Sequence, residues 1–500
     1  MNWTIAPILI PILTALLCLM WSRPSRSRQV FAGVSAGIQL IIAIFLVNRT
    51  YTGDPFVMGL GNWPSQLGII LVVDLLAAIM IALSSLIALA TLVYGFIEIG
   101  PRIEHPLRVP LVQFLVAGIN LSFATGDLFN LFVGFEVMLI ASYSLLTLEA
   151  DDWDVKHAFP YVAINLVGST FFICGAGMAY AMFGTLNFAE ISARAAEMSN
   201  DPRVLALGLL FMVIFGIKAG LFPLYFWLPN SYPTLPVPLA ALYAGMLTKV
   251  GVYVLLRFFG TVMPHDLHLI HKILAWLAGF TMLLAVIGAI SRNFVRGILS
   301  FHILSQIGFM VLAIGFFTPL SIAACIFYIV HHIIVKSSLF LIGGVALCYN
   351  RSDNLDRMGN LWRDVPFLGI LFLCQALSLA GLPPLSGFWG KYLIIVAGME
   401  QHAYVLVAFS ILASVFTLFS MLKIWNGAFW HTSDQVEVRL QDRRAKPMTT
   451  VIAVLAAISL FVGFGAELFY SIAKKAGEQT LNQKAYIELV RGYQGKGASK

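Results

Sequence analysis

The sequence predicts an all-α polytopic membrane protein of about fourteen transmembrane helices, with inverted repeats and two helices broken by proline. Three observations predict this fold class. Hydrophobic residues make up 59% of the chain and charged residues only 11%, whereas a soluble domain needs roughly 25% charged residues to cover its surface. Apolar runs of membrane-spanning length recur along the chain, and one proline-containing phrase occurs twice. Residues 1–500 are therefore interpreted as a single membrane domain.

The predicted spans each contain about 20 mostly apolar residues, which is the length that crosses the hydrocarbon core of a bilayer. In order, they are residues 3–22, 29–48, 68–98, 108–124, 127–148, 158–183, 204–228, 237–257, 272–291, 296–316, 319–348, 365–398, 403–428 and 449–472. Arginines follow the first span instead of preceding it, so it is interpreted as a retained helix and not as a signal peptide. Residues 184–200 mix apolar and charged positions, which indicates an amphipathic interfacial segment.

The distribution of Lys and Arg predicts the orientation of the chain. With both termini outside, the inner loops carry fifteen basic residues and the outer loops before the tail carry five. Cytoplasmic loops are enriched in Lys and Arg, so this bias predicts a bacterial inner-membrane protein with external termini. Residues 474–500 would form an external C-terminal tail, although its six basic residues run against the rule. The net charge of +7 is spread over short loops. This argues against nucleic acid as a partner, and the predicted surroundings of the chain are lipid.

Two of the predicted spans contain proline within the same phrase. Residues 219–227 read AGLFPLYFW and residues 380–389 read AGLPPLSGFW, so Pro223 recurs 161 positions later as Pro384, beside Pro383. Proline removes a helical hydrogen bond, and in lipid such a break is tolerated only inside protein or beside water. The prolines are either ordinary kinks or corresponding breaks in a transport core. Because the seventh and twelfth spans cross in opposite directions, the second interpretation predicts inverted repeats at about 108–257 and 272–428.

Five lysines fall within apolar spans, and this is the sequence feature that points most directly to chemistry. They are Lys218, Lys249, Lys336, Lys391 and Lys423. A charge at the centre of a lipid-facing helix costs roughly 2.5–3.5 kcal/mol, so these side chains should face an interior path or a partner. Burial readily lowers the proton affinity of lysine, which suits it to proton transfer. Lys423 lies close to the end of its span and could instead snorkel to the interface.

An acidic residue within a span could neutralise one of these lysines. Glu136 lies in the middle of the fifth span, and Lys218 is its candidate partner. The two form either a static ion pair or a couple that changes its charge during transport. Asp127, at the start of the same span, could simply cap the helix.

The eleventh span adds histidines to the titratable set. His332 and Lys336 are four residues apart and share a helix face, whereas His331 points about 100° away and is the weaker candidate. Histidine titrates near neutral pH and can accept and donate protons at different nitrogens. His302 and Gln306, also four apart, could extend the polar axis or form a satisfied core pair. Adjacent histidines could bind a metal, but the HExxH spacing typical of zinc on a helix is absent, so no metal site is predicted.

The sequence offers no sign of a cofactor or of ATP as the energy source. All five cysteines lie within apolar runs and none forms a CxxC pair. The chain has no GxxxxGK[ST] phosphate loop. We therefore predict a transporter subunit that is not itself an enzyme.

These residues resemble those of the antiporter-like proton-translocating subunits shared by respiratory complex I, membrane-bound hydrogenases and Mrp cation/proton antiporters. The resemblance covers nearly the whole chain and is carried by Glu136, the Lys218 segment with its proline, Lys249, the phrase around His332, and residues 381–391. Within this family the chain most resembles the D-type subunits of Mrp-type Na⁺/H⁺ antiporters, because Lys391 follows the second break and the chain ends soon after the last span.

The resemblance implies a hydrophilic axis across the membrane midplane. Glu136 and Lys218 would be the coupling pair and Lys249 the bridge. His332 and Lys336 would form the central relay, and Lys391 would be the exit lysine. The implied partners are an A-type homologue and small membrane subunits, with H⁺ and Na⁺ as the transported ions. The alternative is a proton-pumping subunit of a complex I-like NADH:quinone oxidoreductase or membrane-bound hydrogenase.

Overall fold

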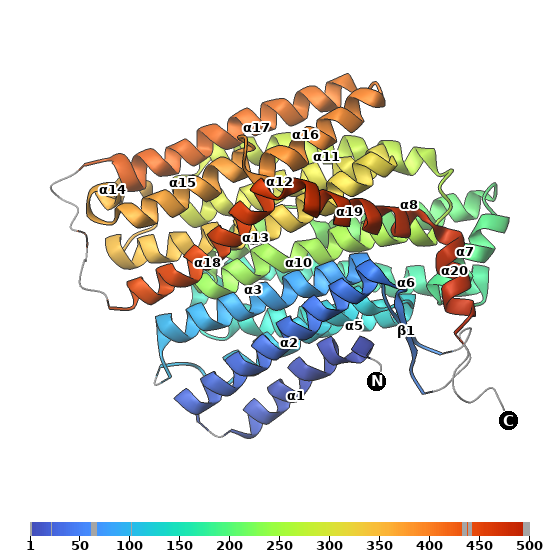
Figure 1. Cartoon of the computed structure of the whole chain (residues 1–500), viewed down its shortest axis with the longest axis horizontal. Coiled ribbons are helices and arrows are strands. Elements are labelled where there is room, and N and C mark those ends of the chain that lie inside the picture. Colours follow the sequence, from blue (N-terminus) through green and yellow to red (C-terminus); the bar gives the residue numbers. More distant parts are fainter. Residues whose placement is uncertain are drawn as a thin grey trace.

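The chain folds into long helices that run side by side (Figure 1). The computed structural model describes residues 3–21, 23–61, 68–101, 103–432, 438 and 443–493. Position 22 of the first predicted span and positions 494–500 of the predicted tail lie outside the described residues.

The first half of the described chain contains all of its strands. The elements are η1 (Trp3–Ile5), α1 (Ala6–Met20), α2 (Arg26–Thr52), β1 (Phe56–Gly59), β2 (Ile70–Val73), α3 (Leu75–Ile99), α4 (Arg108–Ala124), α5 (Leu128–Thr147), α6 (Asp152–Phe183), α7 (Phe188–Glu197), α8 (Pro202–Ala219), α9 (Leu228–Ser231), η2 (Tyr232–Thr234), α10 (Val237–Arg257) and the π-helix η3 (Phe258–Val262).

The second half of the described chain is helical throughout. The elements are α11 (His268–Ser291), α12 (Val295–Phe316), α13 (Pro319–Asn350), η4 (Leu355–Arg357), α14 (Leu361–Asp364), α15 (Pro366–Ala380), α16 (Ser386–Glu400), α17 (Tyr404–Ile424), the π-helix η5 (Trp425–Trp430), α18 (Ala445–Phe464), α19 (Ala466–Leu481) and α20 (Gln483–Arg491).

The predicted fold class is confirmed. In the part of the chain that is described, twelve helices are long and apolar enough to cross a membrane, and α4 and α15 are shorter apolar helices. Helices α10, α12 and α13 are almost completely buried, whereas α1, α2, α6 and α17 expose apolar side chains. The helices that expose apolar side chains therefore surround the buried helices. Polar side chains on the buried helices need partners within the protein.

The third predicted span begins later than the sequence suggested. Residues expected at its start form β2, which pairs antiparallel with β1, so that Ile70 lies opposite Gly59. Asp74 then caps α3, because its Oδ1 accepts a hydrogen bond of 2.9 Å from the Ala77 N–H. The apolar run of residues 68–98 concealed this change, since a short buried strand and a helix have similar composition.

The end of the chain also differs from the prediction. The last predicted span, 449–472, is divided between α18 and α19, which meet at Gly465. Residues expected in a tail form the end of α19 and all of α20, and these helices pack on α3, α13 and α7. Polar residues on the exposed faces of α19 and α20 explain why hydropathy missed them, since both are strongly amphipathic.

The structure contains a pair of matched long helices. Helices α6 and α13 each have 32 residues, and they begin at Asp152 and Pro319. We call the sequence interval between these two starting positions the repeat offset. Each helix ends at a residue with a left-handed backbone conformation, Gly184 after α6 and Arg351 after α13. These two residues are also separated by the repeat offset. The N–H group of each donates to the carbonyl four residues earlier. Two helices of equal length with the same cap indicate one unit used twice.

The backbone bridge before each of these units is matched as well. The Leu128 N–H donates to the Leu186 carbonyl at 2.8 Å, and at the repeat offset the Val295 N–H donates to the Asp353 carbonyl at 2.9 Å. The first bridge adjoins α7 and the second adjoins η4 and α14, which lie at opposite ends of the molecule (Figure 1). The two units therefore point in opposite directions, which supports inverted repeats. The bounds 108–257 and 272–428 stay a prediction.

Both predicted helix breaks are present. Helix α8 ends at Ala219 and α15 at Ala380, and the next residues, Gly220 and Gly381, have φ angles of 81° and 93°. Only glycine adopts this conformation without strain. The prolines follow within a turn, at Pro223 after the first break and Pro383 and Pro384 after the second, and the Phe222–Pro223 and Pro383–Pro384 peptide bonds are both cis. The chain then continues as the short α9 and η2 after the first break but as the longer α16 after the second.

Candidate proton-translocation site

Glu136 and Lys218 meet through a serine. Ser169 Oγ on α6 donates to Glu136 Oε1 on α5 at 2.5 Å, and Lys218 Nζ on α8 donates to Ser169 Oγ at 3.3 Å. Lys218 Nζ also donates to the Asn165 carbonyl at 3.2 Å. Sequence analysis predicted a direct partnership between the two charges, and the structure instead connects them through one hydroxyl group.

Helix α6 and the end of α8 set this geometry. Asn165 and Ser169 are four residues apart and therefore share a face of α6. Lys218 lies in the last turn of α8, where the helix dipole favours a cation. A Cβ atom on Gly168 would lie 3.7 Å from Lys218 Cε, so the lysine stem packs closely on the backbone of α6. The break after Ala219 thus places Lys218 at the end of a helix within the bundle.

Lys249 lies on α10 beside that break. It is fully buried, and its Nζ donates to the Ala244 carbonyl at 2.6 Å and to Thr248 Oγ1 at 3.2 Å. A Cβ atom on Gly251 would lie 2.5 Å from the Ala219 nitrogen, so α10 and α8 are in backbone contact two residues from Lys249. This contact connects the Lys218 end of the site with α10.

His332 and Lys336 lie on α13, which packs against α10. Both are fully buried. Within the described residues, the two ring nitrogens of His332 and the Nζ of Lys336 have no hydrogen-bond partner in the protein. Three titratable groups of two adjacent helices therefore share one buried region.

Lys391 occupies the second break as Lys218 occupies the first. It lies on α16 with 3% of its surface exposed, and its Nζ donates to the Ala380 carbonyl, the last residue of α15, at 3.0 Å. The Nζ also lies 4.6 Å from the ring centroid of Phe309, which is a cation–π distance. A Cβ atom on Gly381 would come within 2.8 Å of Lys391 Cδ, so this glycine also makes room for the lysine.

The three accessory candidates on α12 and α13 have separate partners. His331 Nδ1 lies 2.8 Å from Ser386 Oγ on α16. His302 Nε2 lies 2.5 Å from Ser420 Oγ on α17. Gln306 Oε1 accepts a hydrogen bond from the Tyr328 hydroxyl group. His302 and Gln306 therefore bond to other helices and not to each other.

Two further candidates lie at helix ends. Lys423 Nζ donates to the Ile290 and Arg292 carbonyls and to Asn293 Oδ1, at 2.9, 2.8 and 2.7 Å, so it binds the C-terminal end of α11. Asp127 Oδ1 accepts the Asn130 N–H at 2.8 Å and caps α5. These contacts agree with the structural alternatives for both residues, a position at the end of the span for Lys423 and a helix cap for Asp127.

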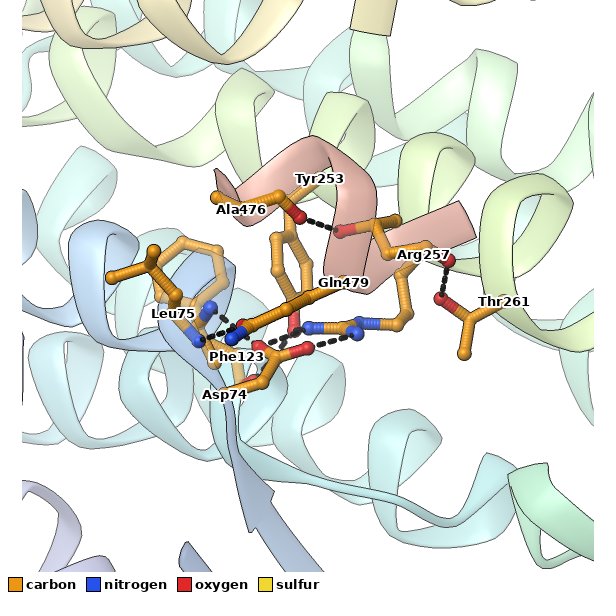
Figure 2. Close-up of polar contacts among 10 residues, drawn as sticks. Asp74, Leu75, Phe123, Tyr253, Arg257, Thr261, Ala476 and Gln479 are labelled. Atoms are coloured by element: carbon orange, nitrogen blue, oxygen red, sulfur yellow. Dashed lines mark hydrogen bonds and ion pairs between the residues drawn. The ribbon is translucent and has the colours of Figure 1, made fainter. Parts of the chain in front are cut away.

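A buried ion pair at the end of α10 was not identified from the sequence. Figure 2 shows Arg257 at the end of α10 facing Asp74, with Tyr253 and Gln479 alongside. The Arg257 Nη1 and Nη2 atoms donate to the two Asp74 carboxylate oxygens at 2.5 and 2.6 Å. Lys249, Tyr253 and Arg257 recur at intervals of four, and this polar stripe on an apolar helix was the signal available in the sequence.

Asn165 and Ser169 were also missed, and the repeat explains their importance. The repeat offset takes Asn165 to His332 and Ser169 to Lys336. The first unit therefore has neutral side chains at the positions where the second unit has titratable ones. The Ser169 hydroxyl group connects Glu136 with Lys218, whereas Asn165 binds Lys218 through its backbone carbonyl.

The chain is similar to known membrane proteins over most of its length. Residues 125–417 match the family described as "NADH:quinone oxidoreductase/Mrp antiporter, TM". The D subunit of the Na⁺/H⁺ antiporter of Alkalihalophilus pseudofirmus is 39% identical over 489 residues, covering 98% of this chain and 99% of the relative. The subunit of the same name from Bacillus subtilis is 35% identical, with the same coverage.

A chain of the solved Mrp complex from Dietzia sp. has the same fold. It superposes with a TM-score of 0.91 at 28% sequence identity, covering 98% of this chain and 99% of that one. The relatives and the solved structure thus match over nearly the full length, and the family model matches residues 125–417. The chain belongs to the NADH:quinone oxidoreductase/Mrp antiporter family of transmembrane subunits and, within it, to the D-type subunits of Mrp antiporters.

Proposed function

We propose that this chain translocates protons as a subunit of a multisubunit secondary Na⁺/H⁺ antiporter, through a relay of Glu136, Lys218, Lys249, His332, Lys336 and Lys391. One observation carries the proposal. Titratable side chains occur on α5, α8, α10, α13 and α16, all of them buried except the half-buried Glu136. These helices are connected in that order by direct contacts or through Ser169 on α6. A static scaffold would not require five separately buried amines and imidazoles within membrane-spanning helices.

The chemistry assigned to each group follows from its surroundings. Lysine can both bind and release a proton when it is removed from water. Lys218 lies in the last turn of α8 and donates to the Asn165 carbonyl of α6. Lys391 lies in the second turn of α16 and donates to the carbonyl at the end of α15. Backbone carbonyls therefore stabilise both ammonium groups. His332 and Lys336 lack protein partners in the described part of the chain, and buried polar groups are normally hydrogen-bonded. Internal water between them would complete the path for protons.

The proposed assembly is a bacterial inner-membrane complex with an A-type homologue and small membrane subunits. Both termini of this chain would lie outside the cell, with the basic loops inside. Glu136 is partly exposed on α5, and a partly exposed carboxylate at membrane depth needs a polar cover. A neighbouring subunit on this face would supply that cover and would couple its own ion movement to Glu136.

The test is Na⁺/H⁺ exchange in vesicles that contain the complete complex and receive no redox substrate. A Na⁺ pulse should move protons in these vesicles and should not do so with the isolated subunit, since the chain has no evident energy-coupling module of its own. Proton movement that required a redox substrate would instead identify the chain as part of a redox-driven pump. Rapid exchange by the isolated subunit would contradict the assignment of the energy source to partner subunits.

A further inference from the structure

The hydroxyl group of Ser169 donates its hydrogen outside its own helix. Serine and threonine within a helix often donate instead to the carbonyl four residues earlier. Thr170, the next residue of α6, does this, because its Oγ1 donates to the Leu166 carbonyl at 3.0 Å. Ser169 Oγ donates to Glu136 Oε1 on α5 at 2.5 Å. The Ser169 hydrogen therefore reaches a neighbouring helix although a backbone carbonyl lies one turn away on α6.

Lys218 occupies that backbone carbonyl. The residue four positions before Ser169 is Asn165, and its carbonyl accepts a hydrogen bond of 3.2 Å from Lys218 Nζ. The same Nζ donates to Ser169 Oγ at 3.3 Å. An ammonium group donates hydrogen bonds and accepts none, so the Ser169 hydrogen has to point away from Lys218. The position of Lys218 thus directs the Ser169 hydrogen to Glu136.

The three side chains form a row in which serine is the middle member. Ser169 and Lys218 are buried and Glu136 is half-buried. Within the described residues, Glu136 and Lys218 form no direct hydrogen bond or ion pair, and Ser169 Oγ contacts both of them. The ring centroid of Phe135 lies 5.8 Å from Lys218 Nζ and places an aromatic ring beside the ammonium group. Among the protein groups, the Ser169 hydroxyl group is therefore the one through which a proton can pass between the two charges.

We propose that the Ser169 hydroxyl group transfers the proton between Lys218 and Glu136. This inference rests on the proposed function, since it adds a residue to the same relay. A hydroxyl group can donate one hydrogen bond while it accepts another. The Ser169 O–H bond breaks as its hydrogen passes to Glu136 Oε1, and a new O–H bond forms with a proton released from Lys218 Nζ. The carboxylate and the ammonium group become a carboxylic acid and an amine, serine stays neutral, and no oxidant or reductant takes part.

The Asn165 carbonyl gives this transfer a way to stop. Once Lys218 is a neutral amine, its bond to that carbonyl is no longer strengthened by charge. If the amine moves away, the carbonyl is free to accept the Ser169 hydrogen, as the Leu166 carbonyl accepts that of Thr170. The hydroxyl group then points along α6 and no longer donates to Glu136. The proton on Glu136 is therefore separated from Lys218 until the lysine returns with a charge.

The test compares Ser169→Ala with Thr170→Val in the complete complex. Each change removes one hydroxyl group of α6 with little change in volume, but the Thr170 hydroxyl bonds only to its own helix. Na⁺-driven proton flux should fall by about tenfold or more in Ser169→Ala, at unchanged complex abundance, and should stay close to the wild-type rate in Thr170→Val. Ser169→Thr keeps a hydroxyl group and should retain most of the flux. Normal flux in Ser169→Ala, or equal losses in Ser169→Ala and Thr170→Val, would overturn the proposal.

The pH dependence separates proton transfer from stabilisation of the two charges. If Ser169 only stabilised the charged forms of Glu136 and Lys218, its loss would move the pH of maximal flux, and the wild-type rate would return at the new pH. A transfer role predicts instead that the flux of Ser169→Ala stays low at every pH, so recovery at a shifted pH would refute it. If Ser169→Ala fails to assemble, Ser169→Thr and Ser169→Val decide, because they have the same shape and differ in the hydroxyl group. Equal flux through those two variants would also count against transfer.

Lys218→Ala, measured in the same vesicles, separates this inference from the proposed function. Normal flux through Lys218→Ala would refute the relay itself. Loss of flux in Lys218→Ala beside normal flux in Ser169→Ala would refute only the role of Ser169. Loss of flux in both, with activity retained in Ser169→Thr, is the result that the proposal predicts.

Discussion

Ser169 determines how the charges of Glu136 and Lys218 can interact. Its hydroxyl group donates to the carboxylate and accepts from the ammonium group, so each charge is solvated by the same side chain. A direct ion pair would bind the two groups more tightly and would resist the gain or loss of a proton. The bridged geometry keeps the groups close while leaving each one free to change its charge, which is what a coupling pair requires.

We predict that the double variant Glu136→Ala/Lys218→Ala assembles but does not transport. Either single change strands a charge at membrane depth, which is strongly destabilising, so both singles should lose transport. The double change removes both charges and with them most of that penalty. Complex abundance and Na⁺-driven proton flux, measured together, report assembly and activity separately. Near-normal exchange by the double variant would show that the pair only holds the helices together.

Lys391 gives a second prediction at the scale of one residue. Lys391→Ala should abolish proton flux while complex abundance is retained, because alanine cannot bind a proton. Lys391→Arg should also be inactive, since arginine does not release its proton in proteins. Lys423→Ala is the matched control, because that lysine binds the end of α11 outside the relay. Active Lys391→Arg complexes would mean that only a positive charge is needed at this position.

At the scale of the elements, the C-terminal helices α19 and α20 form hydrogen bonds with several elements at one end of the molecule. Gln479 of α19 accepts the Leu75 N–H at the start of α3, and the Thr480 carbonyl accepts from Thr261 in η3. Arg491 of α20 binds both oxygens of Glu190 on α7, at 2.8 and 2.9 Å. These contacts connect α3, α7 and η3 and surround the buried Asp74–Arg257 pair.

We predict that Arg491→Ala loosens α20. The contact with Glu190 is half-exposed on the arginine side, so its loss should cost about 1 kcal/mol and speed amide exchange of residues 483–491 about fivefold. Lys484→Ala, an exposed change in the same helix, is the control and should leave exchange unchanged. Equal exchange in both variants would show that apolar packing alone holds α20.

The same contact has a predictable pH dependence. Hydrogen bonds from Arg491 hold the pKa of Glu190 below its usual value of about 4. Because the folded-state pKa is lowered, the contact stabilises α20 at all pH values above the usual carboxyl range and weakens only as the pH falls through it. Exchange of residues 483–491 in the wild-type protein should therefore be as slow in alkaline as in neutral solution, after correction for the intrinsic rate.

The sequence predicted the elements that hydropathy and proline positions reveal. It did not predict the elements whose formation depends on tertiary contacts. The apolar spans and the breaks at Pro223 and Pro384 follow from composition and backbone chemistry. The strand at Ile70–Val73 depends on pairing with the preceding strand, Phe56–Gly59, and α20 depends on docking against α7. Similarly, the lysines were visible as buried charges, whereas Ser169 and Asn165 became visible only once the helices that hold them were in contact.

At the scale of the whole molecule, the two oppositely directed units each contribute titratable side chains to the proposed relay. The first unit supplies Glu136, Lys218 and, through α10, Lys249, and the second supplies His332, Lys336 and Lys391. Each unit has a broken helix with a lysine at the break. In the proposed relay, such an arrangement would give access from both sides of a membrane, which a single unit could not provide.

The most direct test of this account is the Na⁺-driven proton flux of proteoliposomes that contain the complete complex, with this chain either wild-type or carrying Lys249→Ala. Lys249 is fully buried on α10, and its Nζ donates to the Ala244 carbonyl and to Thr248 Oγ1, both uncharged groups. We predict that the wild-type complex moves protons on a Na⁺ pulse without a redox substrate and that the Lys249→Ala complex, present at the same level, moves none. Wild-type flux through the Lys249→Ala complex would contradict a relay through this chain.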